Sequence, residues 1–445
     1  MRYLPHTEAE IAEMLAAIGK ESIDDLFHSI PAELRLREPL KLPPALDERA
    51  LTEHITSLSA DTGGRPFLGA GCYPHHVPAV VSQILLRGEL LTAYTPYQPE
   101  CSQGTLQIIF EYQTMVCALA GLEVANASMY DGAHALAEAA LMALRLKRRA
   151  RRILVSEAIH PEYREVLATY LAHGEAEVIP VPFGEDGATD LSALEEALTD
   201  DTACVVAGYP NFFGVVEPID RIAELAHAKG TLAVSVTTEA VALGLLAPPG
   251  RLGVDIAVGE LGSFGNAMSL GGPQVGFFAS KASALRQLPG RLCGATVDRQ
   301  GRRGFVLTLS TREQHIRRAK ATSNICTNQG LAATAATVHL ALLGRHGIRE
   351  LARLNYLRAR YAREKLAERG VRLAFTGPTF NEFVAEVEDP HAAVRRIEEA
   401  GLEGGLPLDR FFPEGRLCRG LHLCVTEVHE PEEIERLAAA VGGLP

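Results

Sequence analysis

Apolar segments of strand length alternate with helix-like segments between residues 105 and 280, and no other feature constrains the fold as strongly. Helical spacing of apolar residues predicts helices over 106–121, roughly 134–148, 191–198 and 219–229. Continuous apolar runs predict strands at 152–157, 177–183, 203–210, 231–236, 254–258 and 274–279. Strands that are short and apolar throughout, separated by helices, indicate an α/β fold with a mostly parallel sheet covered on both faces.

The two ends of the chain have other patterns. Residues 1–65 are predicted to form a helical arm without a core of its own, because prolines break its helices, and Thr7 with Glu10 predicts a capping box. A large α/β domain is expected over 66–330. The segment 331–445 combines a long helical stretch with shorter strand-like and helical runs, which predicts a small C-terminal α+β domain with an antiparallel sheet.

Composition disfavours several kinds of partner. The net charge of −12 makes nucleic acid an improbable partner, and the basic run 145–152 is better explained as cations near a helix C-terminus. No apolar run is long enough to span a membrane, and the first residues have no secretory signal. The eight cysteines are scattered, which predicts reduced thiols in a cytoplasmic protein and no metal site.

Three polar segments stand out as candidate sites. The turn before the predicted helix at 134 contains Asp131, Gly132 and Ala133, and backbone N–H groups at such a helix start can bind a phosphate. A plain helix cap explains the same residues equally well. The loops at 67–78 and 92–107 are rich in polar, aromatic, Pro and Gly residues, and burial of such groups requires partners. A ligand, a subunit contact or a solvated surface loop would each account for the second loop's polar residues, Tyr94, Tyr97, Gln98, Glu100, Ser102 and Gln103.

The third segment, REQHIRRAKATSNICTNQ at 312–329, is the densest polar motif. A basic helix face is predicted over 312–320, followed by Thr322, Ser323 and Asn324. A charged helix face is usually only solvated, whereas the hydroxyl and amide groups beyond it could meet a phosphate, including one in a partner subunit.

Five motifs together resemble the glycine cleavage system P-protein family, in the alpha-chain form of the two-chain bacterial enzyme, and the resemblance covers essentially the whole chain. They are YTPYQPECSQGTLQIIFEYQT (94–114), YDGA (130–133), YPNFFG (209–214), GGP (271–273) and the segment 312–329. The resemblance implies the fold type I architecture of pyridoxal phosphate (PLP) enzymes.

In this family the catalytic chain carries a cofactor lysine nine residues before the Gly-Gly-Pro turn. Counting back from Gly271 reaches Gly262, so the lysine is missing here, as the resemblance to the alpha chain implies. Fold type I enzymes also place an aspartate on a central strand to protonate the cofactor ring. The matching strand here offers Val236, Thr237 and Thr238, with Glu239 a few residues late. The other lysines are poor substitutes: most lie near helix ends, and Lys320 is surrounded by basic residues.

The resemblance therefore implies a glycine decarboxylase subunit that is inactive alone. PLP is expected in a homologous beta chain, in an α2β2 assembly that acts on glycine and on the lipoyl arm of H-protein. This chain is expected to lend residues to the partner's site: 322–324 toward the phosphate, and the 94–103 loop toward glycine or the lipoyl entrance. Asp131, Gly132, Ala133 and Gly262 would line a vestigial cofactor pocket, in which Gly262 leaves room. The alternatives are a stand-alone PLP enzyme, which lacks its lysine, and a non-enzymatic scaffold with a filled pocket.

Overall fold

The computed structural model describes residues 5–36, 38–59, 65–91, 96–269 and 271–443. The chain divides into two compact units, Met1–Gly63 and Gly64–Pro445. The large and the small sheet belong to one compact unit, so the boundary predicted at residue 330 does not appear in this division. That boundary stays a prediction.

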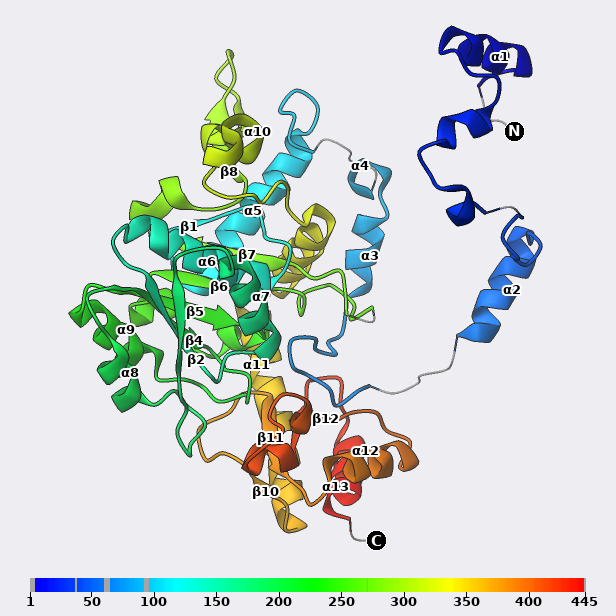
Figure 1. Ribbon diagram of the computed structural model, residues 1–445. Coiled ribbons are helices and arrows are strands. Elements are labelled where there is room, and N and C mark those ends of the chain that lie inside the picture. Colours follow the sequence, from blue (N-terminus) through cyan, green and yellow to red (C-terminus); the bar gives the residue numbers. More distant parts are fainter. Residues whose placement is uncertain (1–4, 37, 60–64, 92–95, 270, 444–445) are drawn as a thin grey trace. The chain divides into compact units, whose positions relative to one another are not determined.

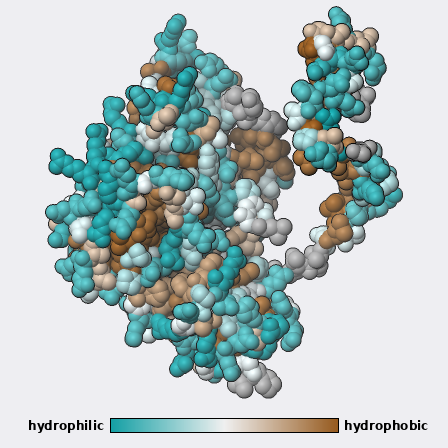
Figure 2. All heavy atoms as spheres, viewed as in Figure 1, coloured by the Kyte–Doolittle hydropathy of each residue, from teal (hydrophilic) through white to brown (hydrophobic). Residues whose placement is uncertain are grey.

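The first unit holds helices α1 Glu8–Ala17 and α2 Glu48–Leu58, with 3-10 turns at 23–27 and 32–34 between them. The predicted capping box is confirmed: the Thr7 hydroxyl accepts from the Glu10 N–H, and the Glu10 carboxylate accepts from the Thr7 N–H at 2.7 Å. None of the described residues 5–59 is buried. Apolar side chains such as Leu51, Ile55 and Leu58 on α2 are about half exposed or more, and brown side chains lie along this unit in Figure 2.

The second unit is built on a seven-stranded sheet of order β1-β7-β6-β5-β4-β2-β3 (Figure 1). Strands β2 to β6 pair in parallel, whereas β7 is antiparallel to both β6 and β1. This confirms the predicted mostly parallel sheet. Its strands are β1 Val124–Ala125, β2 Arg152–Ser156, β3 Glu177–Val181, β4 Thr202–Gly208, β5 Leu232–Thr237, β6 Ile256–Glu260 and β7 Gly276–Ser280.

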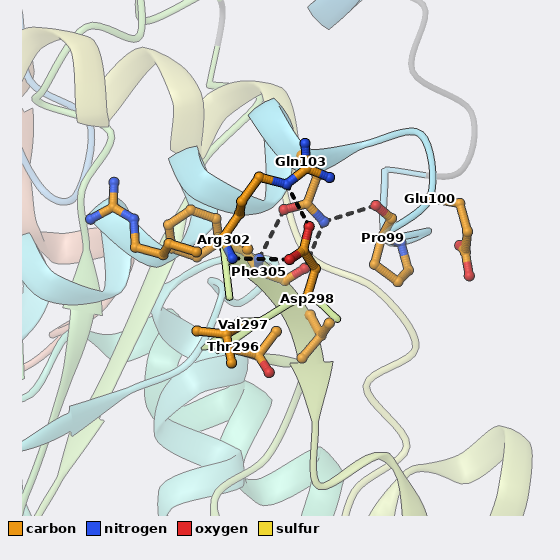
Figure 3. Close-up of a pocket in the computed structure, with 11 residues that line it drawn as sticks. Pro99, Glu100, Gln103, Thr296, Val297, Asp298, Arg302 and Phe305 are labelled. Atoms are coloured by element: carbon orange, nitrogen blue, oxygen red, sulfur yellow. Dashed lines mark hydrogen bonds and ion pairs between the residues drawn. The ribbon is translucent and has the colours of Figure 1, made fainter. Parts of the chain in front are cut away.

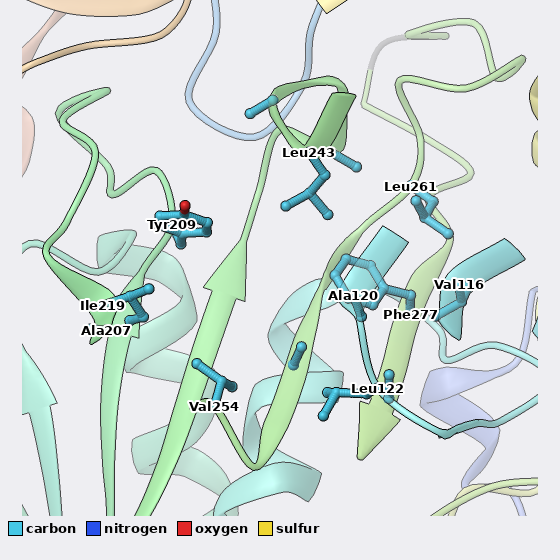
Figure 4. Packing of buried hydrophobic residues seen from close by; sticks show 14 of the residues in the cluster. Val116, Ala120, Leu122, Ala207, Tyr209, Ile219, Leu243, Val254, Leu261 and Phe277 are labelled. Carbon is cyan, nitrogen blue, oxygen red and sulfur yellow. The ribbon is translucent and has the colours of Figure 1, made fainter. Parts of the chain in front are cut away.

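Alternate residues of the strands supply two apolar cores, as the pleat requires. Leu154 and Val205 face the core covered by α5, α8, α9 and the first part of α11, part of which Figure 4 shows. Val155 and Val206 face the opposite core, covered by α6 and α7.

The helices of this unit are α3 Ala79–Leu85, α4 Gly88–Leu91, α5 Gln103–Ala120, α6 Gly132–Leu146, α7 Pro161–Leu171, α8 Leu191–Ala197, α9 Ile219–Ala228, α10 Gln314–Arg317, α11 Gly330–Glu368, α12 Pro390–Glu399 and α13 Pro431–Gly442.

The predicted small antiparallel sheet is present, with the order β10-β11-β13-β12. Helices α12, α13 and the second part of α11 pack on it around Phe383, Leu421 and Leu423. Helix α11 thus contributes to both sheets' cores, and it kinks at Gly344. The strands are β10 Arg372–Leu373, β11 Glu382–Glu386, β12 Leu406–Pro407 and β13 Gly420–Cys424.

Two local features differ from the expectations. The hairpin of β8 Leu292–Val297 and β9 Arg303–Thr308 was not predicted. The predicted basic helix face over 312–320 is wrong, because this segment forms only the short helix α10 and single turns at 310–312 and 318–320. Arg312 explains the break: its guanidinium is partly buried and donates to the carbonyls of Leu288 and Gly290, which ties the segment to the loop before β8.

Candidate functional site

The start of α6 and the loop after β6 meet, as the predicted vestigial pocket requires. Asp131 is the N-cap residue of α6, and its carboxylate accepts from the His134 N–H at 2.8 Å. Gly132 is the first helical residue, and Gly262 lies two residues beyond the end of β6. Strand β6 brings Glu260 between these segments, because Glu260 pairs with Gly276 at the end of the β6–β7 ladder.

Glu260 occupies the place predicted for a phosphate. Its Oε2 accepts from the Gly132 N–H at 2.8 Å, and its Oε1 accepts from the Val275 N–H at 2.6 Å. The side chain is buried, and burial raises the pKa of Glu260 to about 8, although the backbone N–H donors favour the ionised form. The anion-binding start of α6 is therefore satisfied from within the chain.

The space at Gly262 is also filled, so the expectation that this glycine leaves room is wrong. A Cβ at position 262 would lie 2.4 Å from Oε1 of Gln274. The cavity that remains among Cys72, Glu260, Gly262 and their neighbours measures about 10 Å³. Such a volume holds about one water molecule at most.

The end of β5 offers no carboxylate to a cofactor ring. The Thr237 hydroxyl donates to the Tyr209 carbonyl at 2.9 Å, and the hydroxyls of Tyr73 and Thr238 lie 3.1 Å apart. The Glu239 carboxylate is turned to the His75 imidazole, 2.8 Å from its Nε2. PLP therefore does not fit this chain's own pocket: its lysine is absent, its phosphate position is occupied and its ring has no space.

A second set of polar residues joins the 92–107 loop to the 312–329 segment. The Tyr97 hydroxyl bonds the side chains of Thr327 and Asn328, and the guanidinium of Arg291 lies 4.3 Å from the centre of the Tyr97 ring. Arg291 is held in turn by Glu313 at 3.2 Å. A pocket of about 240 Å³ opens beside this group. We refer to these five residues as the Tyr97 cluster.

The rest of the 94–103 loop is arranged around the start of α5. Gln98 accepts the Ser102 N–H at its carbonyl oxygen, at 2.9 Å. The Gln103 side chain donates to the carbonyls of Pro99 and Phe305 at 2.8 and 2.9 Å and joins the loop to the β8–β9 hairpin (Figure 3). Glu100 is exposed, and it lines a pocket of about 750 Å³ together with Gln103 and the hairpin. Tyr94 lies outside the described residues.

Residues 322–324 lie on the 312–329 segment, which also contributes Thr327 and Asn328 to the Tyr97 cluster, but they make different contacts. The Thr322 N–H donates to the Arg312 carbonyl at 3.0 Å. The Ser323 hydroxyl accepts from the Ile325 N–H at 3.1 Å. Asn324 is exposed. The hydroxyl and amide groups that meet Tyr97 are therefore those of 327 and 328.

Sequence reasoning missed Glu260, Gln274, Arg291, Thr327 and Asn328. One signal could have identified Glu260, because a carboxylate at the end of a buried strand, two residues before the position expected for the lysine, requires a partner. Among the described residues, no helix combines the length and apolar character needed to cross a bilayer. No group of three or more His, Cys, Asp or Glu in the same ranges is placed to hold a metal ion.

The fold is that of PLP-dependent fold type I enzymes. A solved C-DES variant with glycine covalently linked to its PLP cofactor has this architecture, with a TM-score of 0.62 and 16% identity over 88% of this chain and 99% of that chain. The chain belongs to the glycine cleavage system P-protein family, whose model it matches over residues 1–441.

Two full-length relatives are much more similar. A probable glycine dehydrogenase (decarboxylating) subunit 1 of Anaeromyxobacter dehalogenans strain 2CP-C is 59% identical, over 99% of this chain and 100% of the relative. A crystal structure of glycine decarboxylase (P-protein) of the glycine cleavage system, in inhibitor-bound form, superimposes with a TM-score of 0.87 and 46% identity, over 100% of both chains. These relatives are consistent with the alpha subunit of a glycine-decarboxylating P-protein.

Proposed function

We propose that this chain is the half of a two-chain glycine decarboxylase that does not carry the cofactor. A homologous beta chain, which has the lysine, binds PLP and supplies the electron sink. Together the chains release CO2 from glycine and pass the aminomethyl group to the lipoyl arm of H-protein, whose disulfide is reduced. The observation that carries this proposal is the filled pocket: Glu260 and Gln274 occupy the space beside Gly262 that a cofactor would need.

Pairing with another chain is supported by the relatives and by the first unit. The relatives are named subunit 1, and the described residues 5–59 expose many apolar side chains without burying any residue. Exposed apolar side chains of this extent are typical of a surface that a partner covers. We propose an α2β2 assembly in the cytoplasm, where the eight free cysteines would stay reduced.

The surface lent to the partner's site is proposed to run from the 94–103 loop to the 312–329 segment. The Tyr97 cluster fixes the two segments to each other, and pockets of about 240 and 750 Å³ open beside Tyr97 and Glu100. A solvated loop would not need such bonding. The segment's Thr322, Ser323 and Asn324 are proposed to face the partner's phosphate, and the loop's polar residues to face glycine or the lipoyl entrance.

Exchange of CO2 with the carboxyl group of glycine, measured on the reconstituted pair, tests this surface. Tyr97→Phe, Glu100→Ala and Thr322→Ala are compared with Tyr361→Phe, a matched loss of an exposed hydroxyl that bonds Glu435 on α13. We expect Tyr97→Phe to lower the exchange rate about 10-fold, the effect of losing roughly 1.4 kcal/mol. Tyr361→Phe should leave the rate unchanged.

A non-enzymatic scaffold is the second candidate function. This hypothesis expects a cofactor pocket filled with side chains, and the pocket beside Gly262 is filled. It differs from the proposal in lending nothing to the partner. Full activity of all three variants in the 94–103 and 312–329 segments would therefore reject the lent surface and favour the scaffold.

A further inference from the structure

The start of α6 holds a carboxylate in the way a phosphate is held at a helix N-terminus. Helix α6 is 15 residues long, and its first N–H, from Gly132, points at Oε2 of Glu260 at 2.8 Å. The Val275 N–H holds the other oxygen at 2.6 Å. Within the described ranges, backbone N–H groups and Asp131 act on the Glu260 carboxyl group, with no cation among them. Its contacts are backbone N–H groups, which are the ligands that bind phosphates at helix starts.

Neighbouring side chains and backbone enclose this carboxyl group. A Cβ at Gly132 would lie 2.3 Å from the Tyr163 hydroxyl and 3.0 Å from the backbone of Gly259. Gln274 closes the side toward Gly262. Glu260 itself is 4% exposed, and the adjoining cavity of about 10 Å³ leaves no space for a second anion.

We propose that the carboxyl group of Glu260 replaces a cofactor phosphate at the start of α6, and that removing this group opens a phosphate site there. In the wild-type chain the site is permanently satisfied, so the fold needs no ligand at this position. Glu260→Ala removes Cγ, Cδ and both oxygens, and the adjoining cavity adds to the space that becomes available. The proposal concerns this chain alone and does not depend on the partner's activity.

Thermal unfolding of the full-length chain in phosphate and in chloride of equal ionic strength tests the proposal. Phosphate stabilises folded proteins in general, so a matched control is needed. Glu217→Ala serves, because Glu217 is also buried and its carboxylate accepts the Thr189 N–H at 2.8 Å and an Asn211 side-chain N–H at 2.9 Å, neither of which belongs to the first turn of a helix. Glu260→Gln is the second comparison, since its amide still fills the space.

Phosphate should stabilise Glu260→Ala more than wild type, Glu217→Ala or Glu260→Gln. At a phosphate concentration ten times the dissociation constant, the folded state of Glu260→Ala is favoured about 11-fold. If Glu260→Ala does not fold in chloride, the yield on refolding is measured in both salts, and phosphate should raise the yield of this variant above that of Glu217→Ala. Equal effects of phosphate on Glu260→Ala and Glu217→Ala, in unfolding or in refolding yield, would overturn the proposal.

Discussion

At the scale of single residues, His75 is a buried cation that connects three separate parts of the chain. Its Nε2 lies 2.8 Å from Glu239, and its Nδ1 lies 2.8 Å from Glu427. Glu427 also accepts from the Asn355 side chain at 2.9 Å, which links the network to α11. Burial opposes the charge, but the two carboxylates raise the pKa of His75 to about 10, while His75 holds the pKa of Glu427 at about 2.

This network predicts a loss of stability at alkaline pH. The pKa of His75 is raised from 6.5 to about 10, so its contribution to folding is complete below pH 6.5 and is lost as the pH rises through about 10. We expect His75→Gln to lower the unfolding free energy by about 3–5 kcal/mol near pH 6.5, because the variant leaves buried carboxylates without their cation. Its deficit relative to wild type should shrink as the pH approaches 10.

Urea unfolding between pH 6.5 and 10 measures this difference. The control is His391→Gln, since His391 pairs with Asp409 at 2.8 Å but both side chains are largely exposed. A deficit of His75→Gln that is the same at every pH would contradict the charge assigned to His75.

Residue roles were only partly predictable from the sequence. The cap at Asp131 follows from the local pattern. The absence of a cofactor lysine at Gly262 is what the family resemblance implies. The role of Glu260 depends on its contact with Gly132, which is 128 positions away in the sequence. No local pattern encodes such a contact, and for this reason the pocket was expected to be open.

At the scale of elements, the kink in α11 depends on one glycine. Gly344 has φ of 56° and ψ of −172°, a backbone region that is open to glycine and strained for other residues. Residues on both sides of the kink, such as Ala336 and Ala352, pack on the core of the large sheet, and Ala362 packs on the core of the small sheet. Nothing lies within 4 Å of a Cβ built at this position, so only the backbone conformation opposes a substitution.

Gly344→Ala should therefore lower the unfolding free energy by about 1–3 kcal/mol through backbone strain. Gly104→Ala is the control, because this glycine also has open space around its Cβ but lies in α5 without a positive φ. Alanine is the better helix former by up to about 1 kcal/mol, so this control should be neutral or stabilising. Urea unfolding of the two variants measures the contrast, and an equal effect of both would show that α11 does not need the kink.

Helices and strands whose apolar residues follow a regular pattern were predicted well, whereas segments without such a pattern were not. The strands β2 to β7 and helices α5, α6 and α9 follow apolar patterns that their burial on the sheet requires. The β8–β9 hairpin was missed because the outer half of β8 is exposed and has no alternating pattern. The segment 312–320 has the charges of a helix face, but the buried contacts of Arg312 determine its turns.

At the scale of the whole molecule, the chain has a well-packed second unit and a first unit with no buried residue in its described part. Its own cofactor pocket is filled, whereas an ordered polar cluster with open pockets lies elsewhere on the second unit. These features agree with a chain that contributes surface to another subunit's chemistry. We propose that catalysis requires both chains of the pair.

The most direct test is the exchange of CO2 with the carboxyl group of glycine, measured in the presence of H-protein and PLP. The chain alone, its lysine-bearing partner alone and the mixture of the two are compared at equal concentrations. We predict full activity only in the mixture, and none in this chain alone at any PLP concentration. Exchange catalysed by this chain without its partner would contradict the claim.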